Sequence, residues 1–108
     1  MTNNNLVPEL MNGEFETFVK EGFVFLDFFA EWCMPCMMMT PIVEDLSEEF
    51  KGKMKFGKVN IDDDQDLAHK FNVSSIPSFF ILKDGKVLEN VNGSVTQEEL
   101  EEMIRRYV

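Results

Sequence analysis

The sequence predicts an α/β fold with a mixed β-sheet and helices on both faces, and three observations support this. The stretch 23–29 is rich in β-branched and aromatic residues with little polar alternation, as in a central strand covered on both sides. A helical pattern over residues 35–50 follows and leads to a second strand, and such a crossover joins parallel neighbours. Asp84-Gly85 is a strong signal for a two-residue hairpin of antiparallel strands. Because 108 residues are the usual size of one domain, we expect a single domain over residues 1–108.

The first helix is predicted over about residues 12–21. Phe15, Phe18 and Val19 recur at helical spacing after Asn12, which is a suitable N-cap. The asparagine run that precedes this segment is predicted to be a frayed end.

The middle of the chain is predicted to form helix, strand and short helix. The helix over residues 35–50 turns one apolar side to the core: Cys36, Met39, Ile42, Val43, Leu46 and Phe50. A strand over residues 54–61 comes next. The acidic residues 62–64 then suit the positive N-terminus of a short helix that carries Leu67 and Phe71.

The C-terminal part is predicted to form the hairpin and a closing helix. Strands over residues 78–83 and 86–91 flank the turn. Thr96 and Glu99 match a capping box that opens the last helix. The apolar side of that helix is Leu100, Met103, Ile104 and Tyr107.

Composition excludes several classes of function. Twenty Asp and Glu against ten Lys and Arg give a net charge of -10, which repels phosphate backbones and anionic lipid headgroups. The longest apolar stretch, residues 23–30, is interrupted by Asp27 and is shorter than the ~20 residues that cross a bilayer. We therefore expect no nucleic-acid partner and no membrane partner. Residues 1–9 lack the pattern of a secretory signal, so we expect a cytoplasmic localisation.

The two cysteines carry the chemistry of the predicted site. Cys33 and Cys36 lie where the central strand ends and the long helix begins. Free N–H groups and the helix dipole lower the pKa of a thiol there, so Cys33 should be the more reactive thiolate, with Cys36 one turn deeper. So short a loop stabilises a fold very little, which favours reversible oxidation over a structural disulfide. Structural zinc needs four ligands, and beyond the pair only His69 remains, so we expect no metal.

Asp27 is a carboxyl group inside an apolar strand. Burial disfavours its charged form, so its pKa should rise toward a value useful for proton transfer. The alternative places Asp27 in solvent at the end of the strand.

The stretch 25–36, which ends in Trp32-Cys33-Met34-Pro35-Cys36, resembles the active-site segment of the thioredoxin family. Further matches follow in the same order over nearly the whole chain: Pro41 within the helix, the strand at 58–62, Ile76-Pro77-Ser78, and Asn92-Gly93 before the last helix. The resemblance implies the thioredoxin fold and a thiol-disulfide oxidoreductase that reduces protein disulfides by dithiol exchange.

The resemblance also implies catalytic roles. Cys33 would attack a partner's disulfide, and Cys36 would resolve the mixed disulfide. Asp27 would accept a proton from Cys36, and Lys58 would temper the pKa of that carboxyl group. The implied partners are disulfide-containing proteins and a thioredoxin reductase that supplies the electrons. No cofactor beyond the cysteine pair is implied, and we expect a monomer.

A second set of residues is implied to bind substrate. Pro77, which the resemblance places with the catalytic residues, would follow a cis peptide bond beside the cysteines, and Ile76 before it would offer backbone groups to an extended substrate. Trp32 would shield the disulfide and contact partners, as would Pro35 within the motif. Gly93 marks either a close approach of the partner or simply a turn.

The sequence departs from the family pattern at four positions. Thioredoxins usually have Gly where this chain has Met34, a basic residue at Met37, Trp at Phe29 and Thr at Ser78. With Met38, the two methionines lie on the outer side of the helix, where they are either a soft apolar surface for substrates or ordinary exposed side chains. Neither methionine stabilises a thiolate, and we expect a reducing potential near the ~-270 mV of thioredoxin.

Two other functions remain open at this point. Two thiolates with three thioethers close by are soft ligands, so the chain could bind Cu(I). A thioredoxin-like interaction module with incidental cysteines is the third possibility.

Overall fold

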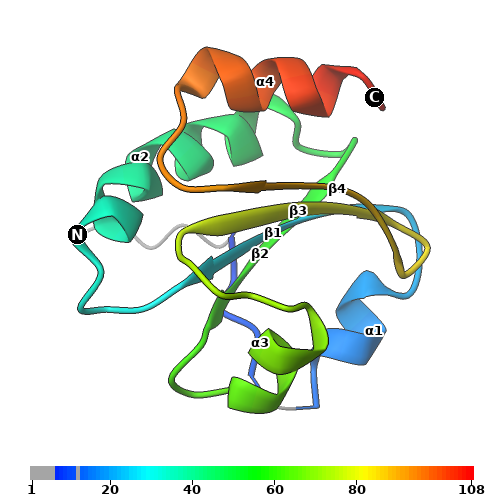
Figure 1. Cartoon of the computed structure of the whole chain (residues 1–108). Helices are drawn as coiled ribbons and strands as arrows, with labels where there is room; N and C mark the ends of the chain where they lie inside the picture. The colour runs from blue at the N-terminus through cyan, green and yellow to red at the C-terminus, as the bar shows by residue number, and fades with distance from the viewer. Residues whose placement is uncertain (1–6, 12) are drawn as a thin grey trace.

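Residues 7–11 and 13–108 are described by a computed structural model, in which helices and strands follow the predicted order (Figure 1). The elements are α1 (Phe15–Val19), β1 (Phe23–Phe29), α2 (Met34–Glu49), β2 (Lys55–Asn60), α3 (Gln65–Lys70), β3 (Ser78–Lys83), β4 (Lys86–Asn92) and α4 (Gln97–Arg105). None of these helices is long and apolar enough to cross a membrane.

The sheet is mixed, as predicted, with the strand order β2-β1-β3-β4. β1 runs parallel to β2 and antiparallel to β3, and β3 pairs antiparallel with β4. The hairpin turn is Asp84-Gly85, where φ is 51° and 85°. Two successive positive φ angles are what a two-residue turn between twisted strands requires, which explains the residue pair found there.

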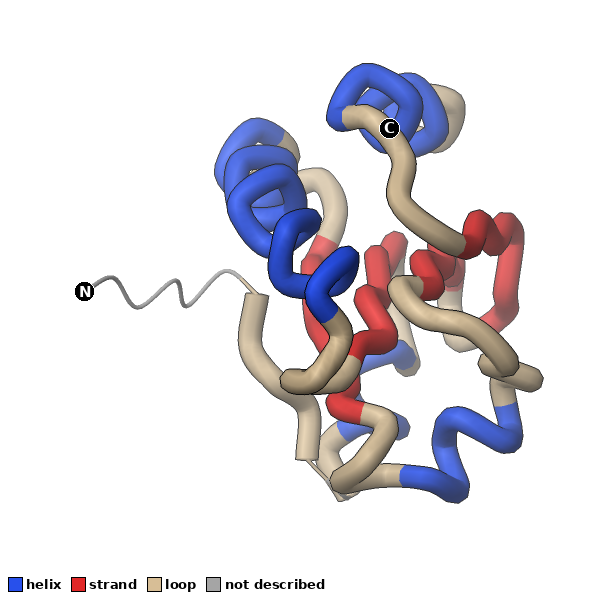
Figure 2. Tube along the Cα trace, turned by 60° about the vertical axis from the view of Figure 1, so that its left-hand side comes forward, coloured by secondary structure: helices blue, strands red, loops and turns tan. Residues whose placement is uncertain are grey.

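Helices cover both faces of the sheet, and each face has its own core (Figure 2). Phe25 in β1 packs with side chains of α2 and α4 on one face. Its neighbour Leu26 points to the opposite face, toward the side chains of α1 and α3. Because side chains alternate along a strand, the next residue on the α2 face after Phe25 is Asp27. The strand pattern therefore puts a carboxyl group beneath the long helix.

Element boundaries differ from the predictions by a few residues. α1 begins only after Glu14 and ends at Val19, because Gly22, with φ at 82°, allows the chain to turn into β1. The predicted N-cap Asn12 and the asparagine run lie outside the described residues. α2 begins one residue earlier than predicted, since Cys33 itself is the N-cap.

Residues 7–10 form an edge contact that the sequence pattern did not reveal. Leu10 N–H donates to the Lys58 carbonyl at 2.8 Å, and Lys58 N–H donates to the Pro8 carbonyl at 3.0 Å. Val7 and Leu10 are both buried. Gly57 makes room for this segment, because a Cβ there would lie 3.0 Å from the Leu10 side chain.

Candidate active site

Cys33 and Cys36 are joined by a disulfide at the N-terminus of α2. Cys33 is the N-cap, and its Sγ accepts the Cys36 N–H at 3.2 Å. Pro35 fits the first turn of α2, where a missing N–H costs no helical hydrogen bond. The sequence prediction that the pair opens the helix is confirmed.

Both cysteines are more buried than their position at the N-terminus of a helix suggests. The Cys33 residue keeps 5% of its surface and Cys36 keeps 2%, so Cys33 is the outer of the two. Phe29 and Ala30 pack with the cysteines, and Ile76 lies against this cluster. Attack by a partner therefore has to come through the small part of Cys33 that faces solvent.

Asp27 lies on the α2 face of the sheet and is 5% exposed. Its Oδ1 is buried without a hydrogen-bond partner among the described residues. Burial raises the pKa of Asp27 to about 7, while the positive charge of Lys58 acts in the lowering direction. The predicted burial and the predicted rise of the pKa are both confirmed.

Lys58 is the register partner of Asp27 across the parallel pair β1 and β2. Its Nζ lies 5.5 Å from the centroid of the Phe29 ring, and the residue is half-buried. An ammonium group here can stabilise the carboxylate without closing a direct ion pair, since no salt bridge joins the two among the described residues.

Trp32 is held by a residue that the sequence interpretation did not single out. The side chain is 69% exposed, and its Nε1–H donates to Asp62 Oδ2 at 3.0 Å. Asp62 follows β2, and the Asp62 N–H is accepted by Asn60 Oδ1 at 2.9 Å. The only signal in the sequence was the acidic run after β2, which was assigned to the start of α3.

A second loop approaches the cysteines at the start of β3. The Ile76–Pro77 peptide bond is cis, as the resemblance implied. The Pro77 carbonyl accepts the Gly93 N–H at 2.7 Å, and Gly93 has a φ of 88°. Ser78 Oγ–H donates to Asn92 Oδ1 at 2.6 Å, which ties the two strand ends together behind the loop. Ile76 and Gly93 are thereby brought to the same end of the sheet as Cys33.

The methionines on α2 differ in exposure as their spacing predicted. Met34 is 67% exposed, Met38 is 69% exposed and Met37 is 36% exposed, whereas Met39 is buried. Together with Trp32, the three exposed methionines form an apolar surface beside the disulfide, which we call the methionine lip. Met34, Met37 and Met38 lie in the first two turns of α2, which Cys33 opens, and their contact with substrate stays a prediction.

The arrangement joins two groups that can exchange electrons and protons. A cysteine pair that closes to a disulfide can give up or accept two electrons, and a buried carboxyl group with a pKa of about 7 can bind and release a proton near neutrality. The thioredoxin family model matches residues 6–106.

The chain belongs to the thioredoxin family.

Similar proteins agree over nearly the full length. Thioredoxin of Listeria monocytogenes serovar 1/2a is 40% identical over 103 residues, which are 95% of this chain and 100% of the relative. Thioredoxin of Bacillus subtilis strain 168 is 39% identical over 94 residues, which are 87% of this chain and 90% of the relative. A solved structure of a mutant thioredoxin from Halobacterium salinarum matches with a TM-score of 0.85 and 29% identity, covering 99% of this chain and 96% of that one.

Membership in the thioredoxin family fixes the class of activity. Thioredoxins are protein-disulfide oxidoreductases, and this chain has the close cysteine pair that the reaction needs. The family uses disulfide proteins as substrates and a reductase as partner, and it needs no cofactor beyond the cysteines. Within residues 7–11 and 13–108, no group of three or more His, Cys, Asp or Glu is placed to hold a metal ion.

Proposed function

We propose that this thioredoxin-family chain is a cytoplasmic, monomeric reductase of protein disulfides that a thioredoxin reductase recharges. The observation that carries the proposal is the disulfide-forming pair at the start of α2, with a buried, proton-binding Asp27 on the face of the sheet beneath that helix. The acidic net charge of -10 supports a protein partner over nucleic acid or lipid.

The proposed reaction has two exchange steps. The Cys33 thiolate attacks one sulfur of the substrate disulfide, which forms a mixed disulfide and releases the other sulfur as a thiolate that takes up a proton. The Cys36 thiol then loses its proton and attacks Cys33 Sγ, which releases the second substrate thiolate. Two electrons pass to the substrate, and Cys33 and Cys36 end as the disulfide seen here.

Asp27 is proposed to take the proton from Cys36. A base works best when its pKa lies near the operating pH, and burial brings the pKa of Asp27 to about 7. Lys58, its register partner, limits this rise. Without that positive charge the pKa of Asp27 would be higher, and a smaller fraction of its carboxyl group would be ionised at neutral pH.

Substrate is proposed to lie across the loop before β3. Neither the N–H nor the carbonyl of Ile76 takes part in a backbone hydrogen bond among the described residues, so both can pair with an extended peptide. Trp32, Met34, Pro35 and Met37 would contact one side of that peptide, and Gly93 would contact the other.

Insulin reduction by dithiothreitol tests the proposed function. We expect wild type to accelerate the reaction, Cys33→Ser to abolish the acceleration, and Cys36→Ser to stop after forming a mixed disulfide that gel electrophoresis without reductant detects. Acceleration by Cys33→Ser equal to that of wild type would contradict the assignment of the nucleophile. Size-exclusion chromatography with light scattering tests the monomer.

A further inference from the structure

The basic side chains are concentrated at one end of the sheet, whereas acidic side chains occur at both ends. Six lysines lie at the end where β1 begins, in chain segments that pair with or adjoin its first residues: Lys20, Lys51, Lys53, Lys55, Lys83 and Lys86. Arg105 joins them, because it forms an ion pair with Glu49 at the C-terminus of α2, and Arg106 is its neighbour in sequence. Only Lys58 and Lys70 lie elsewhere.

The end that carries the cysteines has acidic side chains but no basic ones. The segments that meet there, residues 29–38, 60–66, 72–78 and 92–99, contain no Lys and no Arg. They contain seven acidic residues: Glu31, Asp62, Asp63, Asp64, Asp66, Glu98 and Glu99. One of them, Asp62, accepts the hydrogen bond from Trp32 next to Cys33. The approach to the disulfide therefore lies in a negative potential.

The methionine lip forms an apolar surface within this acidic end. Trp32 and Met38 are each 69% exposed and Met34 is 67% exposed, although large apolar side chains are usually covered. An apolar centre with a rim of one charge sign is the pattern of a protein interface, and the complementary surface has apolar side chains within a rim of the other sign.

Resting on the proposed function, we propose that the preferred substrates are proteins whose disulfide lies beside an apolar side chain and is flanked by Lys or Arg. A negative field around the nucleophile attracts such a surface during diffusion and repels an acidic one. Far from the site, the lysines at the start of β1 add to the molecular dipole and orient the cysteine end toward the basic partner. The chemistry remains dithiol exchange, in which two electrons and two protons pass from Cys33 and Cys36 to the substrate.

Two matched peptides test the preference. Each has one internal disulfide and a leucine beside one cysteine, with four flanking lysines in one peptide and four glutamates in the other. Reduced protein, freed of dithiothreitol, is mixed with each peptide, and the second-order rate constant is measured after acid quench by mass spectrometry. We expect the lysine peptide to react at least about tenfold faster in 0.01 M salt. The ratio should fall to within about twofold in 1 M salt, where the Debye length is only about 3 Å.

A pair of charge-reversed variants locates the effect. Glu31 and Asp63 are exposed and lie at the cysteine end, whereas Glu21 and Glu48 are exposed and lie at the opposite end. We expect the double variant Glu31→Lys/Asp63→Lys to lower the rate ratio at least about fivefold, because its charges lie close to the reacting sulfur. The double variant Glu21→Lys/Glu48→Lys changes the net charge equally and should retain most of the wild-type ratio.

The outcomes separate this inference from the proposed function. Equal rates for the two peptides at low salt would overturn the charge preference while leaving disulfide reduction intact. Equal effects of the two double variants on the rate ratio would show that net charge sets the preference, which would contradict the proposed role of the acidic residues at the cysteine end. Absence of reaction with both peptides would contradict the proposed function itself.

Discussion

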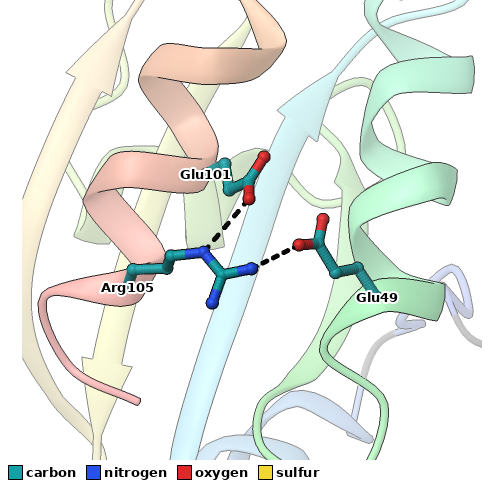
Figure 3. A network of polar contacts seen from close by, with 3 residues as sticks. All are labelled: Glu49, Glu101 and Arg105. Carbon is teal, nitrogen blue, oxygen red and sulfur yellow. Dashed lines mark hydrogen bonds and ion pairs between the residues drawn. The ribbon is translucent and has the colours of Figure 1, made fainter.

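The partial charges at the two ends of α2 meet different side chains. At the N-terminus the partial positive charge of the helix is not answered by an acidic side chain in the first turn, and the Cys33 sulfur accepts a helix N–H instead. At the C-terminus the residues Glu48 and Glu49 add negative charge to an end that is already negative. Arg105 of α4 compensates, with Nη2 2.6 Å from Glu49 Oε2 and Nε 3.1 Å from Glu101 Oε2 (Figure 3).

The N-terminal end of α2 therefore serves the reaction, and its C-terminal end serves the stability of the fold. A helix end without a counter-charge favours an anion, so it suits a cysteine that must become a thiolate. The far end contributes core packing through Leu46 and Phe50, which keep 0% and 1% of their surface. Substitutions at the two ends should therefore affect different measurements.

Phe50→Ala should have the largest effect on stability. Phe50 is enclosed in the core between α2 and α4, and Phe→Ala substitutions at such sites cost about 3–5 kcal/mol of unfolding free energy. Urea unfolding monitored by circular dichroism measures this loss, with Phe50→Leu as a milder control. Insulin reduction per folded molecule should remain that of wild type. Loss of activity in a sample shown to be folded would mean that the far end of α2 also shapes the site.

Asp27→Asn should change the pH dependence of stability. The pKa of Asp27 is about 7 in the folded protein, whereas a carboxyl group exposed in the unfolded chain has a pKa of 3.8. Between these two pH values the folded state therefore binds more protons than the unfolded state. The wild-type unfolding free energy should therefore fall as pH rises from 4 to 7, at about 1.4 kcal/mol per pH unit for this group, or ~4 kcal/mol in all. The variant lacks this fall.

Urea unfolding of both proteins at pH 4, 6 and 8 measures the difference. The unfolding free energy of the variant should rise relative to that of wild type with each step in pH, and the variant should be the more stable protein at pH 8. Parallel curves over the whole range would show that the Asp27 carboxyl group titrates in the folded state as it does in water.

The sequence predicted those parts of the site that depend on neighbours in the chain. Cys33 and Cys36 are three residues apart at a strand-to-helix junction, and the pattern of β1 favoured a buried Asp27 over one in solvent at the end of the strand. The position of Asp27 relative to the cysteines follows from the alternation of side chains along β1 and from the start of α2 soon after that strand. The cis peptide bond at Ile76–Pro77 was expected only because of the resemblance, since the residues alone favour trans.

Contacts between distant segments were harder to predict. The bond from Trp32 to Asp62 spans 30 residues, and the acidic run gave no hint which carboxylate would be used. The pairing of residues 7–10 with β2 was missed because the segment is short and contains Pro8. Gly57 was the available signal, because a glycine inside a strand often marks the close approach of another backbone.

Met38→Gln tests the N-terminal end of α2 with a moderate effect. If the methionine lip contacts substrate, loss of part of the apolar contact should raise KM for a disulfide protein about fivefold, which corresponds to about 1 kcal/mol of burial. The urea midpoint should not move, because Met38 is 69% exposed. Met11→Gln is the matched control, since Met11 is 50% exposed and lies before α1. Equal KM values for both variants and wild type would remove Met38 from the interface.

Arg105→Gln should have the smallest effect, and it tests the C-terminal end of α2. The hydrogen bond to Glu101, followed by the attraction of Glu101 and Glu49, raises the pKa of Arg105, so the guanidinium group is charged at every working pH. Arg105 is 53% exposed, and exposed ion pairs contribute little because water and salt screen them. We expect the melting temperature in 0.15 M salt to fall by about 2 °C or less, with a larger fall in 0.01 M salt.

Glu49→Gln should recover part of the loss, because it removes the repulsion that Arg105 compensates at the negative end of the helix. Differential scanning calorimetry of the two single variants and the double variant measures this coupling. Equal shifts at both salt concentrations would assign the role of Arg105 to its packing on the Phe50 ring, whose centroid lies 5.0 Å from the guanidinium carbon.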